Sequence, residues 1–249
     1  MESFVQTFGD DGKAELNTLV PEHRVEFVPQ DETTFRYGGL QIKDGVLRLV
    51  FALGNLAVNV SDVSRDFAEA LKKADAAGSG NAYNIVARKA VRDDYDTKID
   101  DIQDAIGKLV GIPDIKINGN FENNAAALAK AGDKVSSDWD QGFGDGTFGY
   151  FEGFKSQLEY KGFKDDEMLQ EGFQEGVSKN EVQLRVVDKL VKGSYHEIFI
   201  ENGVLVIQVS RPNELVKFDP IVYLTNFQTV PENWRTNVSY VGENILEIL

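Results

Sequence analysis

The chain has 249 residues, of which 42% are hydrophobic and 10% aromatic, a composition that supports a folded core and excludes a disordered protein. Its 26 basic and 41 acidic residues give a formal net charge of −15, which disfavours binding to nucleic acid and to anionic membranes. No cysteine is present, so disulfides, thiolate metal sites and cysteine nucleophiles are excluded. With no recognisable secretory leader and no apolar run long enough to span a bilayer, the sequence predicts a soluble, cytoplasmic protein.

The N-terminal part is predicted to form strands. Apolar and polar residues alternate there in short runs, and Asp44-Gly45 stands between two of them. This dipeptide is typical of the tight turn of a β-hairpin, because both positions accept a positive φ. The strands are predicted at residues 24–29, 35–42, 46–51 and 56–60.

The middle of the chain, residues 62–192, is predicted to be helical. Apolar residues recur there at spacings of three and four, as on the buried face of an amphipathic helix. We expect helices at about 62–74, 84–110, 123–139 and 165–191. The many aspartates of the second helix are expected to form its solvated face. A short extended piece is expected at 114–118.

The C-terminal part returns to strands, around a second turn dipeptide, Asn202-Gly203. Residues 200–207 resemble residues 42–49. Two explanations stay open: either hairpins resemble each other because turn chemistry dictates it, or related hairpins from the two ends meet in one sheet or pack face to face. The C-terminal strands are predicted at residues 195–200, 204–210, 221–227 and 238–249.

Together these elements predict an α+β fold with a single domain over residues 1–249. Its antiparallel sheet or sheets would be built from the N- and C-terminal hairpins and would pack against a central run of about four helices. The terminal strands occupy 24–60 and 195–249, and the helical middle occupies 62–192.

Groups for catalysis are scarce. The chain has two histidines, His23 and His196, and neither lies in a recognisable catalytic motif. Residues 144–149 match the glycine fingerprint of dinucleotide-binding folds, but polar residues of helical pattern precede them instead of a buried strand. No catalytic residue is predicted and no cofactor can be named, so a binding protein is favoured over an enzyme.

Three acids, Asp138, Asp140 and Asp145, are close enough in the sequence to suggest a calcium loop. An EF-hand loop starting at Asp138 needs glycine at its sixth place and glutamate at its twelfth. Phe143 and Gly149 stand there instead, so this match fails. No metal-ligand set is predicted, and a loop of another kind stays open.

Residues 139–154 are rich in both aromatic residues and glycines. Aromatic faces stack on flat molecules, and glycines let the backbone approach a ligand closely. The alternative is an irregular plug of rings that closes the core under a loop. The ligand-binding residues predicted from this segment are Trp139, Phe143, Phe148, Tyr150 and Phe151.

The function predicted from the sequence is non-catalytic binding of a small molecule. The ligand would be flat or apolar, such as a pigment-like aromatic, and would lie between helices and sheet. Two alternatives are an enzyme that uses carboxylate or histidine acid–base chemistry, and an acidic protein-interaction module. The identity of the ligand, the pathway and the formation of a homo-oligomer stay open.

Overall fold

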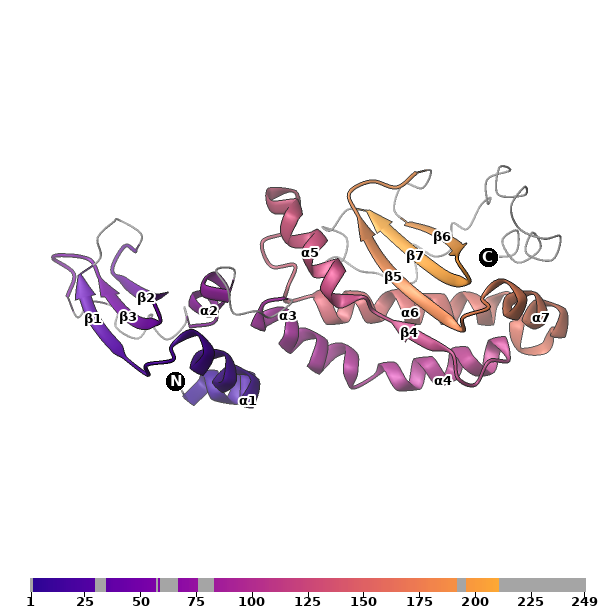
Figure 1. Cartoon of the computed structure of the whole chain (residues 1–249), viewed down its shortest axis with the longest axis horizontal. Coiled ribbons are helices and arrows are strands. Elements are labelled where there is room, and N and C mark those ends of the chain that lie inside the picture. Colours follow the sequence, from indigo (N-terminus) through magenta and orange to yellow (C-terminus); the bar gives the residue numbers. More distant parts are fainter. Residues whose placement is uncertain are drawn as a thin grey trace. The chain divides into compact units, whose positions relative to one another are not determined.

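The structure is a computed structural model that describes residues 2–29, 35–56, 58, 67–75, 83–191 and 196–210. The chain divides into two compact units, residues 1–89 and 90–249. In Figure 1 the first unit runs from indigo to purple and the second from magenta to orange. Helices and strands occur in both units, so the fold is a mixed α and β structure. A single domain over the whole chain stays a prediction.

The first unit contains a three-stranded sheet of order β1-β3-β2. Its strands are β1 (Val25–Pro29), β2 (Gly38–Lys43) and β3 (Val46–Phe51). β2 and β3 form the predicted antiparallel hairpin, and Asp44 and Gly45 have φ values of 54° and 72°. β1 pairs with β3 in parallel, which corrects the expectation of a purely antiparallel sheet. This register places Glu26 opposite Arg48, and their side chains form an ion pair of 3.2 Å.

Helices cover part of this sheet and complete the first core. They are α1 (Glu2–Leu19), α2 (Phe67–Asp75) and the beginning of α3 (Ile85–Ala90). Phe4 of α1 packs in a tilted arrangement against Phe8 and against Phe67 of α2, with ring centroids 5.0 and 4.6 Å apart. α1 is not among the predicted elements, because a glycine, Gly9, lies in the middle of it and interrupts its helical periodicity, with φ 58° and ψ −142°. α2 confirms the described part of the helix predicted at 62–74.

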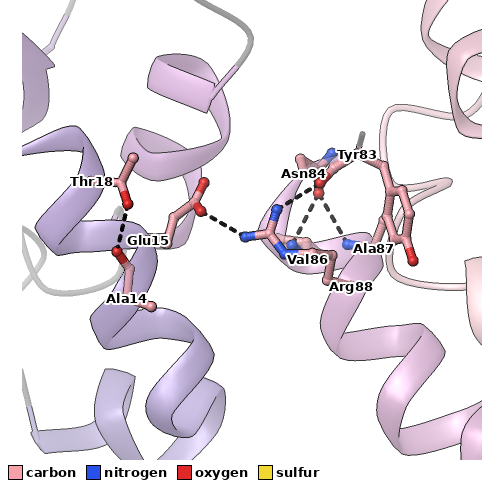
Figure 2. A network of polar contacts seen from close by, with 8 residues as sticks. All are labelled: Ala14, Glu15, Thr18, Tyr83, Asn84, Val86, Ala87 and Arg88. Carbon is pink, nitrogen blue, oxygen red and sulfur yellow. Dashed lines mark hydrogen bonds and ion pairs between the residues drawn. The ribbon is translucent and has the colours of Figure 1, made fainter. Parts of the chain in front are cut away.

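A polar network ties α1 to the start of α3 (Figure 2). Asn84 caps α3, because its Oδ1 accepts hydrogen bonds from the backbone N–H groups two and three residues ahead. Arg88 donates to the carboxylate of Glu15 over 2.8 Å and to the carbonyl of Tyr83 over 2.7 Å. Glu15 is 3% exposed, so this ion pair neutralises a carboxylate that is buried.

The second unit contains a four-stranded sheet of order β4-β5-β7-β6. Its strands are β4 (Lys116–Asn118), β5 (Glu181–Val187), β6 (His196–Glu201) and β7 (Val204–Ser210). β6 and β7 form the predicted antiparallel hairpin around Asn202-Gly203. β4, β5 and β7 are parallel to one another, so this sheet is also mixed. The two turn dipeptides therefore belong to hairpins in two separate sheets.

The helices of the second unit differ from the prediction in where they end. They are the π-helical turn η2 (Val91–Asp96), α4 (Ile99–Val110), α5 (Phe121–Ala131), the short η3 (Gly132–Lys134), α6 (Phe143–Tyr160), the short η4 (Phe163–Asp165) and α7 (Glu167–Gly176). The helix predicted at 84–110 is divided into α3, η2 and α4. The helix predicted at 123–139 ends at Ala131, where Gly132 has a positive φ of 55°.

The largest correction concerns the helix predicted at 165–191. It ends at Gly176, and the following stretch forms β5, one of the two inner strands of the sheet. Val182, Leu184 and Val186 are buried at every second position, and this alternation outweighs the weaker helical spacing. The short extended piece predicted at 114–118 is confirmed as β4.

Side-chain amides join the elements of the second unit. Asn124 of α5, 1% exposed, accepts a hydrogen bond from the N–H of Val186 and donates to the carbonyl of Leu184, so it extends the edge of β5 beyond the short β4. Gln170 and Gln174 of α7 donate to carbonyls in the last turn of α4 over 3.1 and 3.0 Å. These bonds satisfy backbone groups that would otherwise lack partners.

Some predicted elements lie wholly or partly outside the described residues. The strands predicted at 221–227 and 238–249 belong to this group. Of the strand predicted at 56–60, only Leu56 and Val58 are described, and both lie in turns. Among the residues that the structure describes, no helix is both long enough and apolar enough to cross a membrane.

Candidate functional site

The segment of rings and glycines forms a regular helix. Its first residues lie in a turn, and α6 begins at Phe143 and continues to Tyr160. An irregular plug of rings was the alternative considered in the sequence analysis, and the helical conformation of Phe143–Tyr160 differs from it. One stripe of α6 is buried at spacings of three and four: Phe143, Thr147, Phe151, Phe154 and Leu158.

The glycines of α6 permit close packing between helices. A Cβ atom added to Gly144 would lie 2.0 Å from the carbonyl oxygen of Ala90, a distance that real Cβ atoms do not adopt. α6 packs against η2, which follows Ala90 directly, and it runs beside α4 (Figure 1). The cost of glycine inside a helix, about 1 kcal/mol relative to alanine, is therefore offset by contacts between helices.

The structure separates the five predicted ligand-binding residues into two groups. Phe143, Tyr150 and Phe151 are buried, with exposed fractions of 1%, 6% and 0%. Trp139, in the turn before α6, and Phe148, within α6, are half-buried. The two half-buried rings are the ones that solvent already reaches.

Three of these five residues, Trp139, Phe143 and Phe151, belong to one continuous series of rings. Trp139 packs edge-to-face on Phe143 and Phe143 on Phe121, both at 5.4 Å between centroids. Phe121 packs on Tyr95 at 4.8 Å, and Tyr95 lies 6.3 Å from Phe151. We call these five residues the ring cluster. It begins at the half-buried Trp139 and Phe121 and ends in the core at Phe151.

Thr147 lies on α6 between two members of the ring cluster. It is four residues after Phe143 and four before Phe151, so its side chain leaves the helix on the same side as those rings. Thr147 is 0% exposed, and its Oγ1 has no hydrogen-bond partner within the described part of the chain. A buried hydroxyl without a partner costs about 1–3 kcal/mol, so this position calls for an explanation.

Other hydroxyls in the helices show the bond that Thr147 does not make. Thr18, Thr97 and Ser156 each donate to the carbonyl four residues earlier, over 2.8–3.0 Å. A serine or threonine in a helix ordinarily satisfies its hydroxyl in this way. The hydroxyl of Thr147 makes no such bond, and Thr147 lies on the face of α6 that Phe143 and Phe151 share.

Two carboxylates act on Tyr95 of the ring cluster. Burial, together with the charges of Asp96 and Asp100, raises the pKa of Tyr95 above its ordinary value of 10.0, so the phenol stays neutral in the physiological range. Next to the cluster, the ammonium of Lys98 lies 5.2 Å from the centroid of the Phe148 ring and 3.9 Å from a carboxylate oxygen of Asp145.

The three acids considered for calcium differ in their surroundings. Asp140, directly after Trp139, is 1% exposed, whereas Asp145 is exposed on α6 and forms the contact with Lys98. Ser136 donates a hydrogen bond to Asp138. Among the described residues, no three acidic or histidine side chains are grouped closely enough to hold a metal ion.

The two histidines belong to different units. His23 is exposed in the segment before β1 and has a positive φ of 51°. His196 is half-buried in β6, and burial lowers its pKa below 6.5.

Three contributors to this site were not predicted from the sequence: Tyr95, Phe121 and Thr147. Tyr95 was placed on an apolar helical seam, and Thr147 stood inside the rejected glycine fingerprint. Phe121 carried no signal, because its contact with Phe143 arises only from the tertiary structure. Comparison of the chain with protein-family models, with curated proteins and with solved structures gives no match.

Proposed function

We propose that this protein is a non-catalytic binding protein whose second unit holds a small, flat, largely apolar molecule at the ring cluster. Of the five residues predicted from the sequence, Trp139, Phe143 and Phe151 belong to the ring cluster, and Trp139 offers the ring that a ligand reaches from solvent. Phe148 and Tyr150 lie on α6 outside the cluster. The ligand contacts Trp139 and Phe121 first.

The observation that carries this proposal is the hydroxyl of Thr147. It is buried and has no partner in the described part of the chain, and it leaves α6 on the side of Phe143 and Phe151. A ligand with one polar atom satisfies this hydroxyl, while its apolar body lies against the rings. Ligand sites in proteins commonly combine many apolar contacts with a few placed polar groups.

A first experiment looks for a molecule that accompanies the protein. Native mass spectrometry and an absorption spectrum of the purified full chain are expected to reveal an organic mass that unfolding releases. Protein that carries no such molecule is then titrated with 2-naphthol, which is flat and has one hydroxyl. Binding of 2-naphthol at micromolar concentration supports the proposal. A protein without a bound molecule that also fails to bind 2-naphthol contradicts it.

A pair of variants tests the role of the hydroxyl. Thr147→Val keeps the shape of the side chain and is expected to weaken binding of 2-naphthol roughly threefold to tenfold, the usual value of one hydrogen bond. Naphthalene, which lacks the hydroxyl, should bind both proteins equally. Thr97→Val is the matched control, because Thr97 is exposed and donates to Asp93. Equal loss in both variants would contradict the assignment.

A further inference from the structure

We infer that two copies of this chain associate through β1, the edge strand of the first unit, so that their two three-stranded sheets become one continuous sheet. The inference goes beyond the proposed function, because β1 lies in the first unit and the ring cluster in the second. Its basis is an open strand edge, exposed apolar side chains on the same strand and balanced charges around it.

The strand β1 has an open side. Among the described strands it pairs with β3 only, so it forms the outer edge of its sheet (Figure 1). The carbonyl of Arg24, directly before β1, accepts a hydrogen bond from the N–H of Leu47 on β3 over 3.1 Å. Successive residues of a strand direct their backbone groups to opposite sides, so those of Val25, Phe27 and Pro29 point to the open side. Such an edge is a template for pairing with another strand.

The apolar side chains of β1 are exposed to solvent. Val25 and Phe27 have exposed fractions of 55% and 63%. The register with β3 places them beside Leu47 and Leu49, which belong to the core that packs against α1 and α2. The ring of Phe27 stacks on Phe51 at 4.7 Å between centroids. β1 therefore continues the apolar face of the sheet beyond the part that the rest of the chain covers, as an interaction surface does.

The usual protection of an edge strand is weak in β1. Proteins protect such edges with lysines, prolines or bulges. β1 contains no lysine, and its proline, Pro29, stands at the last position of the strand. The one charged residue of β1, Glu26, forms ion pairs with Arg24 over 3.3 Å and with Arg48 over 3.2 Å. No unbalanced charge on β1 therefore opposes the approach of a second strand.

The distribution of charge favours a second copy as the partner. Residues 1–89 contain 10 basic and 13 acidic residues, whereas residues 90–249 contain 16 and 28. Most of the net charge of −15 therefore belongs to the second unit, and two first units approach each other with little repulsion. A strongly charged peptide gains little from the balanced edge, whereas a second copy supplies the same exposed apolar side chains.

An antiparallel pairing centred on Phe27 fits the backbone of β1. A two-fold axis brings the same strand of each copy together. With the axis at Phe27, the two Phe27 residues exchange both backbone hydrogen bonds, and the N–H of Val25 donates to the carbonyl of Pro29 in the second copy. Glu26 then lies opposite Val28 of the second copy. An axis at Glu26 would place two carboxylates opposite each other, which is unfavourable.

Sedimentation equilibrium of the full chain, from about 1 µM to about 300 µM, tests the inference. A monomer–dimer equilibrium with a micromolar dissociation constant is expected, since one strand from each copy makes a small interface. Phe27→Lys places two like charges opposite each other and should weaken dimerisation roughly tenfold or more. Met168→Lys is the matched control, because Met168 is 72% exposed on α7. Circular dichroism checks that both variants are folded.

Two outcomes of this experiment overturn the inference. A chain that stays monomeric over the whole range of concentrations leaves the edge of β1 to a partner other than a second copy. Equal effects of Phe27→Lys and Met168→Lys would show that the association does not use β1.

A crosslinking experiment tests the register independently of the lysine variants. The chain has no cysteine, so Phe27→Cys can form a disulfide only with a second copy. Opposed residues of a hydrogen-bonded antiparallel pair have Cα atoms about 5.5 Å apart, a distance that a disulfide spans. Under mild oxidation, Phe27→Cys is expected to form covalent dimers faster than Met168→Cys, which is similarly exposed. Equal rates would overturn the pairing centred on Phe27.

Discussion

Thr147 is the single residue on which the account depends most. In protein freed of small molecules, Thr147→Val removes a buried hydroxyl that has no partner in the described structure, so the free energy of unfolding should rise by about 1 kcal/mol. Urea denaturation measures this change. Thr97→Val, at an exposed position, should shift it by less than about 0.5 kcal/mol. A loss of stability in Thr147→Val would mean that the protein itself uses the hydroxyl.

His196 gives a prediction about pH at the same scale. Burial lowers its pKa in the folded protein below 6.5, so the unfolded chain takes up a proton first as the pH falls. Stability is therefore lost as the pH falls below 6.5 toward the pKa of the folded state. In His196→Gln, the melting temperature should fall less between pH 7 and pH 5 than in the unchanged protein. His23→Gln, at an exposed position, should keep the original pH profile; identical profiles for all three proteins would refute this.

At the scale of elements, α6 combines a structural face with an accessible face. Phe151→Ala empties a fully buried position and should cost about 3–5 kcal/mol of unfolding free energy. Phe148→Ala removes a half-buried ring and its contact with Lys98, which should cost about 1 kcal/mol. Chemical denaturation compares the two. Similar losses would mean that Phe148 belongs to the core and is unavailable to a ligand.

The junction of α5 with β5 depends on one amide. Asn124→Ala leaves the N–H of Val186 and the carbonyl of Leu184 without this partner in a buried place, so the free energy of unfolding should fall by roughly 2–4 kcal/mol. Asn123→Ala, next to it and exposed, should change it by less than about 0.5 kcal/mol. Urea denaturation measures both changes. Equal losses of unfolding free energy in the two variants would contradict the assigned role of Asn124.

Elements governed by local chemistry could be predicted from the sequence. Asp44-Gly45 and Asn202-Gly203 located both hairpins, because turn geometry depends on the residues of the turn alone. The parallel partners of β3 and β5 could not be predicted, since such pairing joins strands distant in the chain. α6 could not be predicted as a helix, because its glycines oppose helix formation. These glycines permit close packing between helices, as at Gly144 against Ala90, and such packing arises only from the tertiary structure.

At the scale of the whole molecule, the candidate site was predictable only in its α6 part. The aromatic content of residues 139–154 indicated Trp139 and Phe143, but Tyr95 and Phe121 join them through folding of the second unit.

The most direct test follows the indole N–H signal of Trp139 by nuclear magnetic resonance during titration with 2-naphthol. The chain has two tryptophans, so a Trp234→Phe variant leaves the signal of Trp139 alone. The account predicts a saturable shift of this signal. When Thr147→Val is added, the affinity for 2-naphthol obtained from the shift should be roughly threefold to tenfold lower. A Trp139 signal that does not move at any concentration of 2-naphthol would contradict a ligand site at the ring cluster.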